Sequence, residues 1–231
     1  MEKIVASSLV PRDLHVNEAL KTLRTNLMFS GPSVRVIGFT SFGPGEGKTT
    51  LSLQTAISFA QMGKRVLLVD ADLRKSVLAG QLRIRSKVEG LSHYLSGLAN
   101  ISELLRETDI PGLYIMLAGA RVPNSTELLG SENFARLVPA LKEVFDYVIV
   151  DTAPVGQVID CALMAPHLDG IAMVIDATHN SHKLERRIKK QLERSGGKVL
   201  GVVLNQVDTS FERGYYGRYY GGYNYYTEDS K

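Results

Sequence analysis

The chain has 231 residues, 44% of them hydrophobic, and carries a formal net charge of +3. This length and composition suit one compact α/β domain with short appendages, and the small charge excess is by itself no argument for nucleic-acid binding. Cys161 is the only cysteine, which excludes an internal disulfide and a multi-cysteine metal site. No stretch approaches the roughly 18 to 20 apolar residues that cross a bilayer, and the N-terminus lacks the apolar core of a secretory signal, so we expect a cytoplasmic protein.

The first element in chain order is an amphipathic helix within HVNEALKTLRTNLMF, residues 15–29. Three leucines share one stripe at about 100° per residue, namely Leu20, Leu23 and Leu27. Glu18 and Lys21 lie away from this stripe and Arg24 lies at its edge. These polar residues could meet another subunit, or Glu18 and Lys21 could form only an exposed ion pair one turn apart. We assign residues 1–30 to a helical segment with a candidate role in oligomerisation.

Short β-rich runs then alternate with helical stretches. The runs are VRVIGF (34–39), RVLLVD (65–70), LYIML (113–117), YVIVD (147–151), GIAMVID (170–176) and KVLGVVLN (198–205). Most are continuously apolar rather than alternating, as in strands that helices cover on both faces. The pattern predicts a mostly parallel, doubly wound α/β sheet with helices on both faces, and we assign residues 31–208 to this domain.

A glycine-rich loop follows the first run, in TSFGPGEGKTTLS (40–52). Its backbone amides could converge on phosphate oxygens at the positive end of the helix that begins near Lys48. Lys48 would reach the β and γ phosphates of ATP, and the Thr49 hydroxyl is placed for Mg²⁺. Phe42 replaces the first glycine of the usual P-loop pattern, so the loop is a variant; the alternative is a turn that only caps a helix. The predicted nucleotide-binding residues are Gly43, Pro44, Gly45, Glu46, Gly47, Lys48, Thr49 and Thr50.

Acidic side chains end two of the predicted strands. Asp151 ends YVIVD at the rim where open α/β sheets hold ligands, and an Asp there commonly binds Mg²⁺. LLVDADLRK brings Asp70, Asp72 and Arg74 to the same rim. These residues could instead be helix caps or solvated strand ends.

The segment RGYYGRYYGGYNYY (213–226) holds seven of the ten tyrosines and no aliphatic side chain. Without apolar neighbours to bury, it is predicted to be a mobile, exposed tail rather than a packed element. Three uses compete for it: stacking on nucleic acid, low-complexity association, and a set of hydroxyls that can be modified. We assign residues 209–231 to this tail.

Together these motifs resemble those of the bacterial tyrosine kinases. PGEGKT, D-x-D-x-R (70–74) and V-I-V-D-x-x-P (148–154) are similar to the Walker A, A′ and B motifs of that family, and VPNSTELL (122–129) and LGVVLN (200–205) extend the resemblance over nearly the whole chain. The D-x-D-x-R element is the specific part, since ordinary P-loop ATPases lack it. Two departures are Ser125 in place of a proline and Lys21 in place of an arginine. The resemblance implies a P-loop NTPase fold, ATP and Mg²⁺ as cofactors, and the soluble form typical of Gram-positive bacteria.

The resemblance also implies roles for individual residues. Asp70 would accept the proton of a tyrosine or orient its hydroxyl, and Arg74 would contact the phosphates or neutralise the two carboxylates. Asn205 would touch adenine, by analogy with related ATPases. The implied catalytic residues are Lys48, Asp70, Asp72 and Arg74, and the implied metal ligands are Thr49, Asp72 and Asp151. The implied phosphoacceptors are Tyr215, Tyr216, Tyr219, Tyr220, Tyr223, Tyr225 and Tyr226.

The implied function is an ATP-dependent protein-tyrosine kinase that phosphorylates its own tail between subunits and regulates capsule or exopolysaccharide synthesis. The implied partners are further copies in a ring held through Glu18, Lys21 and Arg24, protein substrates, and a tyrosine phosphatase. A chain-length-determinant-like transmembrane activator would recruit the kinase to the inner face of the membrane. No nucleic-acid partner is expected.

Two other function classes fit part of the sequence. A partition or septum-positioning ATPase would share the fold, but those relatives have a signature lysine where this chain has Gly43, and they lack the tyrosine tail. A scaffold or nucleic-acid binder would use the aromatic tail, but the predicted ATP and Mg²⁺ rim argues against it. A charged helix over residues 181–195 could meet anionic lipid or an acidic partner, or be a solvated face.

Overall fold

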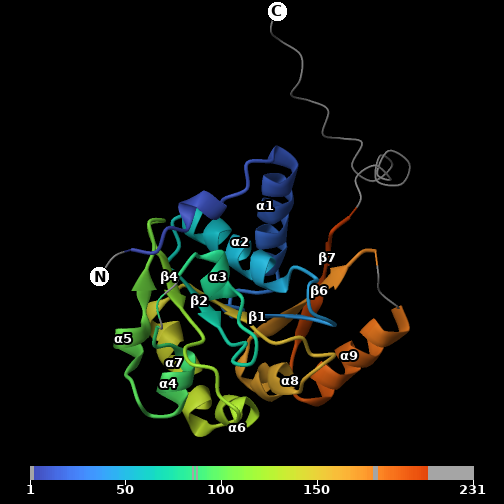
Figure 1. Ribbon diagram of the computed structural model, residues 1–231. Helices are drawn as coiled ribbons and strands as arrows, with labels where there is room; N and C mark the ends of the chain where they lie inside the picture. Colours follow the sequence, from blue (N-terminus) through green and yellow to red (C-terminus); the bar gives the residue numbers. More distant parts are fainter. Residues whose placement is uncertain (1–2, 85, 87, 179–181, 208–231) are drawn as a thin grey trace, which may run out of the picture.

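The computed structural model describes residues 3–84, 86, 88–178 and 182–207. Within these ranges seven strands form one sheet in the order β3-β4-β2-β5-β1-β6-β7 (Figure 1), in which β3 is antiparallel to β4 and all other neighbours are parallel. The strands are β1 (Val36–Ser41), β2 (Val66–Asp70), β3 (Arg106–Glu107), β4 (Leu113–Met116), β5 (Tyr147–Asp151), β6 (Gly170–Asp176) and β7 (Val199–Asn205). The predicted doubly wound α/β fold is confirmed, and each predicted run matches a strand to within two residues.

Helices cover both faces of the sheet (Figure 1) because the strand side chains divide into two buried clusters. In β2, Leu67 and Val69 belong to one cluster, whereas Val66 and Leu68 belong to the other, as the alternation of a strand requires. One face carries α1 (Leu14–Phe29), α2 (Lys48–Gln61) and α3 (Leu78–Gln81). The other carries α4 (Leu91–Leu95), α5 (Ile101–Leu104), α6 (Ser125–Leu129), α7 (Glu132–Val144), α8 (Asp160–Met164) and α9 (His182–Arg194).

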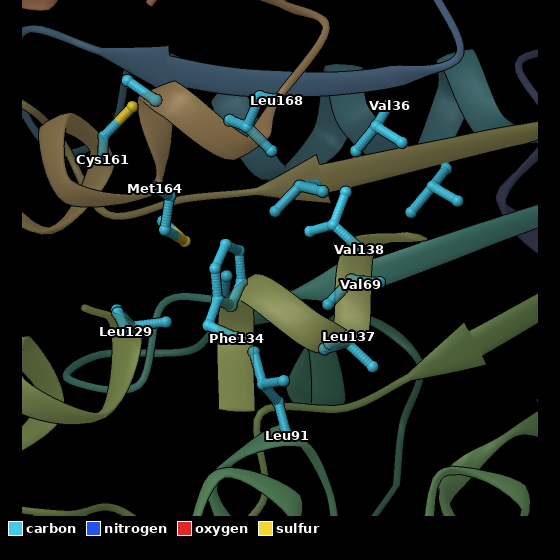
Figure 2. Close-up of a cluster of buried hydrophobic side chains, with 14 of the residues drawn as sticks. Val36, Val69, Leu91, Leu129, Phe134, Leu137, Val138, Cys161, Met164 and Leu168 are labelled. Atoms are coloured by element: carbon cyan, nitrogen blue, oxygen red, sulfur yellow. The ribbon is translucent and has the colours of Figure 1, made fainter. Parts of the chain in front are cut away.

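The cluster that contains Leu67 and Val69 is centred on α7, whose apolar residues face the sheet. Figure 2 shows the Phe134 ring between Met164 and Leu91, which come from α8 and α4. Phe134 is 1% exposed. This packing fixes α8 and α6 beside the carboxyl ends of the strands, where the ligands of open α/β sheets bind.

The N-terminal helix α1 packs on α2 through the predicted leucine stripe: Leu20 and Leu27 are buried and Leu23 is partly buried. Arg24 turns inward, where its Nη1 donates to the Ser58 carbonyl oxygen at 2.8 Å. α1 contributes to the core of the domain. The assignment of residues 1–30 to a segment of their own remains a prediction. Within the described residues, no helix combines the length and apolar composition needed to cross a bilayer.

Candidate active site

The predicted site residues converge at the carboxyl edge of the sheet. β1, β5 and β2 are neighbours there, and Asp70 pairs in register with Asp151. The loop after β1 closes a cavity of about 380 Å³ above these strand ends. Its walls include every residue from Gly43 to Thr50, together with Asp72 and Arg74.

The glycine loop adopts a backbone that only glycine accommodates at its turn into α2. Gly47 has φ 86°, and a Cβ there would lie 2.1 Å from the Asn205 Nδ2. α2 begins at Lys48 with no side-chain cap, so the amides of its first turn are left for an external acceptor. A helix N-terminus with free amides at a cavity suits an anion such as phosphate.

Side chains from inside the loop and from the end of β7 hold this loop in place. The Glu46 Oε1 accepts from the Gly43 N–H at 2.8 Å. The Asn205 Nδ2 donates to the Glu46 carbonyl at 2.9 Å, and the Gln206 Nε2 donates to the Gly45 carbonyl at 3.0 Å. Asn205 therefore braces the phosphate loop, a role that its sequence context did not indicate, while its contact with adenine remains a prediction.

Lys48 and Asp151 form a buried ion pair beneath the cavity. The Lys48 Nζ lies 2.6 Å from the Asp151 Oδ1, and the two side chains are 7% and 2% exposed. The Ser52 hydroxyl donates to the same carboxylate oxygen at 3.3 Å. Burial raises the pKa of Asp151, and the Lys48 charge opposes this rise.

Asp70 is a second buried carboxyl group at this strand edge. Its oxygens accept from the Ser76 hydroxyl and, at 3.2 Å, from the Asp72 N–H. Burial, followed by repulsion from Asp151, raises the pKa of Asp70 to about 7. A carboxyl group of this pKa can take up or release a proton near neutral pH.

The donor set at the edge fits Mg²⁺ bound mainly through phosphate. Asp72 is buried, lines the cavity and accepts from the Lys75 N–H at 2.9 Å, so it is at once a turn cap and a candidate ligand. Together with Asp70 and Asp151 it leaves a negative charge that Lys48 only partly neutralises. In the part of the chain that the structure describes, no three His, Cys, Asp or Glu side chains form a metal site of their own. Mg²⁺ commonly uses one or two carboxylates, water and substrate phosphates.

The structure corrects one of the two roles predicted for Arg74, neutralisation of Asp70 and Asp72, whereas its contact with the phosphates remains a prediction. Its guanidinium neither pairs with Asp70 nor with Asp72 but binds Asp160, from the start of α8, through Nε at 2.8 Å and Nη2 at 3.2 Å. Sequence reasoning missed Asp160, because it lies 86 residues from Arg74 and follows a loop rather than a strand. The only signal in the sequence is an acidic residue in the apolar stretch after the YVIVD strand.

The predicted oligomerisation residues stand apart from the cavity. Glu18 and Lys21 form an exposed ion pair at 2.7 Å on α1, and Arg24 bonds within its own domain. The exposed pair weighed as the alternative is thus present, and a subunit contact through these residues remains a prediction. The seven predicted acceptor tyrosines, residues 215 to 226, lie outside the described residues.

Comparison with known proteins supports one family. A family model described as an AAA domain matches residues 34–200. The tyrosine-protein kinase CpsD of Streptococcus pneumoniae is 43% identical over 208 residues, which cover 89% of this chain and 91% of that protein. The kinase domain of the Escherichia coli tyrosine kinase ETK is 31% identical with a TM-score of 0.79, covering 82% of this chain and 75% of that domain.

A more distant structure shares the fold alone. The septum site-determining protein MinD of Pyrococcus horikoshii, solved with Mg-ADP, is 22% identical with a TM-score of 0.63, covering 74% of this chain and 70% of that chain. The motifs, the cavity and the closer relatives agree, and this chain belongs to the family of bacterial tyrosine-protein kinases.

Proposed function

We propose that the chain is an ATP-dependent protein-tyrosine kinase whose acceptors include the tyrosines of its own C-terminal segment. The observation that carries the proposal is the cavity formed by the phosphate loop, which Lys48 lines, together with the buried Lys48–Asp151 ion pair and the buried Asp70 carboxyl in register with Asp151. Phosphoryl transfer requires in-line positioning and neutralisation of phosphate charge, and little covalent chemistry from the protein. The cavity has groups suited to both tasks.

The loop amides and Lys48 would bind the phosphates of ATP. Lys48 is now paired with Asp151, so its ammonium group has to turn toward phosphate oxygens, within reach of the same cavity. Thr49, Asp72 and Asp151 are the oxygen donors that would hold Mg²⁺ directly or through water. When bound, Mg²⁺ supplies charge neutralisation on the transferred phosphoryl group.

Asp70 would accept the proton of the attacking phenol or fix its orientation. Its pKa of about 7 makes it a stronger base than an exposed carboxylate, although a nearby cation would lower that pKa. Ser76, which donates to the Asp70 carboxyl, would hold the second oxygen in place. The phenol would then enter between Asp70 and the terminal phosphate.

The acceptors we propose are Tyr215, Tyr216, Tyr219, Tyr220, Tyr223, Tyr225 and Tyr226. A flexible segment of about 20 residues spans roughly 25 Å, compared with a radius of gyration of roughly 16 to 17 Å for a domain of about 200 residues. A tail of this length can therefore reach a neighbouring subunit, and we propose that transfer occurs between subunits. The glycines between the tyrosines would allow several to be presented in turn.

Phosphorylation would also regulate assembly. Each phosphate adds about −1.5 to −2 charges, so seven would add roughly −10 to −14 to a chain of net charge +3. We propose that unmodified subunits form a ring, in which Glu18, Lys21 and Arg24 contact the next subunit, and that phosphorylated subunits separate. A transmembrane activator would hold the kinase at the inner face of the membrane, a tyrosine phosphatase would reset it, and the cycle would regulate capsule or exopolysaccharide synthesis.

The test is phosphotyrosine formation with ATP and Mg²⁺, in the presence of the cytoplasmic segment of an activator. Lys48→Met is expected to abolish the signal, and Lys190→Met, an exposed lysine on α9, is the matched control. Mixing Lys48→Met with a variant that carries phenylalanine at all seven tail tyrosines tests transfer between subunits. Phosphotyrosine should then appear on the Lys48→Met chain. If the wild type is phosphorylated but the mixture contains no phosphotyrosine, transfer between subunits is contradicted.

A further inference from the structure

We propose that Asp160 is a positioning residue, which holds the Arg74 guanidinium side-on so that its free edge meets the phosphoryl group transferred in the cavity. The inference deepens the proposed kinase function and rests on it. It concerns a cluster of three side chains, Arg74, Asp160 and Thr126, that come from the segment after β2 and from α8 and α6.

The geometry of the cluster fixes the guanidinium in its plane. Asp160 accepts from the Arg74 Nε at 2.8 Å and from Nη2 at 3.2 Å, so both carboxylate oxygens are used on one side of the guanidinium. The Thr126 hydroxyl accepts from the same Nη2 and donates to the Asp160 Oδ1 at 3.0 Å. A planar fork held by two acceptors loses its rotational freedom, which a lysine at this position would retain.

The remaining edge of Arg74 is left for a ligand. Among the described residues, no protein acceptor takes the Nη1 hydrogens. Arg74 is 38% exposed and lines the nucleotide cavity next to Asp72. A preorganised guanidinium edge aimed at developing charge on phosphoryl oxygens is a recurrent way to lower the barrier of phosphoryl transfer.

Burial explains why Asp160 suits this task. Its side chain is 0% exposed and does not line the cavity, whereas Arg74 does, so Asp160 would act on the site through Arg74. The hydrogen bond to Asp160 is the first cause of a raised Arg74 pKa; burial opposes the rise, and the charges of Asp160, Glu127 and Asp72 add to it. The pair therefore behaves as a fixed cation with a buried counter-ion. A purely structural role, tying α6 to α8, would need no exposed guanidinium edge.

The test compares kcat, KM and melting temperature for Asp160→Asn, Thr126→Val and Thr126→Ser, with ADP formation and phosphotyrosine both measured. Losing the fixed orientation is expected to lower kcat roughly 100-fold in Asp160→Asn, since misplacement by about 1 Å costs about that much. ADP affinity should stay within about threefold, because the free edge meets the transferred group. Thr126→Val should lower kcat roughly tenfold, and Thr126→Ser should restore it.

The double variant separates positioning from structure. If Asp160 acts through Arg74, adding Asp160→Asn to Arg74→Ala leaves kcat at the Arg74→Ala value. The inference would be overturned if Asp160→Asn lowered kcat by the same factor in the wild type and in the Arg74→Ala variant. It would also be overturned if Asp160→Asn lowered the melting temperature and left kcat unchanged. If Asp160→Asn fails to fold, Thr126→Val and Thr126→Ser, at a half-buried residue, are compared in the wild-type and Arg74→Ala backgrounds instead. An inactive wild type would count against the kinase function, whereas an active wild type with insensitive variants would count against Asp160 alone.

Discussion

Replacing Asp70 with asparagine is expected to stabilise the nucleotide-free protein while abolishing phosphoryl transfer. The carboxyl group is fully buried, and the charge of Asp151 repels it further, so its pKa is raised from 3.8 to about 7. Because the folded-state pKa lies above the unfolded value, the stability contributed by the protonated group is fully present below about pH 4. It is lost as the pH rises through about 7. A neutral amide of the same shape has no such loss.

The magnitude follows from the size of the shift. Each pKa unit corresponds to about 1.4 kcal/mol, so the stability advantage of Asp70→Asn should grow from about 1 kcal/mol near pH 4.5 to about 4 kcal/mol near pH 8. For a domain of this size, about 4 kcal/mol corresponds to a rise in melting temperature of roughly 10 °C. Active sites often contain buried, mutually repelling charges, so a substitution that removes one commonly raises stability and lowers activity.

The assay is thermal and urea unfolding at several pH values, in EDTA and without nucleotide. Glu132→Gln is the matched control, because Glu132 is 84% exposed on α7 and should change stability little at any pH. A stability difference between Asp70→Asn and wild type that is the same near pH 4.5 and pH 8 would refute the reasoning. So would a variant less stable than wild type near pH 8.

Three further changes have expected outcomes. Lys48→Met leaves a buried carboxylate without its cation, so the apo protein should lose about 3 kcal/mol of stability by urea unfolding; an unchanged midpoint would contradict the buried pair. Phe134→Ala should cost about 3 to 5 kcal/mol, whereas Phe29→Ala, at a residue 83% exposed, should cost under about 0.5 kcal/mol; similar losses would disprove the core assignment. Asn205→Ala removes one hydrogen bond to the phosphate loop, so ADP affinity measured by calorimetry should fall roughly tenfold. Gln206→Ala should have a smaller effect. An unaltered ADP affinity in Asn205→Ala would exclude the bracing role.

The sequence predicts the sheet well because its strands are buried on both faces. Continuous apolar runs of five to eight residues are easily distinguished from the amphipathic helices between them, as in YVIVD (147–151), which matches β5. The two-residue β3 was missed, since two residues show no periodicity. It pairs antiparallel with the β4 edge, and the Glu107 carbonyl accepts from the Ile4 N–H on its other side, so it depends on non-local contacts.

The site was predictable as far as its residues lie in local motifs. The phosphate loop, Asp70 and Asp151 are each recognisable from a few neighbouring residues, and register brings the two carboxyl groups together. Asp160 and the bracing role of Asn205 depend on pairs 86 and 159 residues apart, which no local pattern encodes. The direction of Arg24 into α2 likewise depends on how α1 docks, which the leucine stripe fixes only in part.

Two of the last three residues described before the tyrosine segment also hold the phosphate loop. Asn205 and Gln206 each donate a hydrogen bond to a loop carbonyl, so the chain just before the C-terminal segment is bonded directly to the nucleotide loop. A partner that binds the chain beyond Val207 and displaces Asn205 or Gln206 would weaken these hydrogen bonds to the phosphate loop. By thermodynamic reciprocity, a nucleotide that tightens the loop must also change how readily that segment is captured.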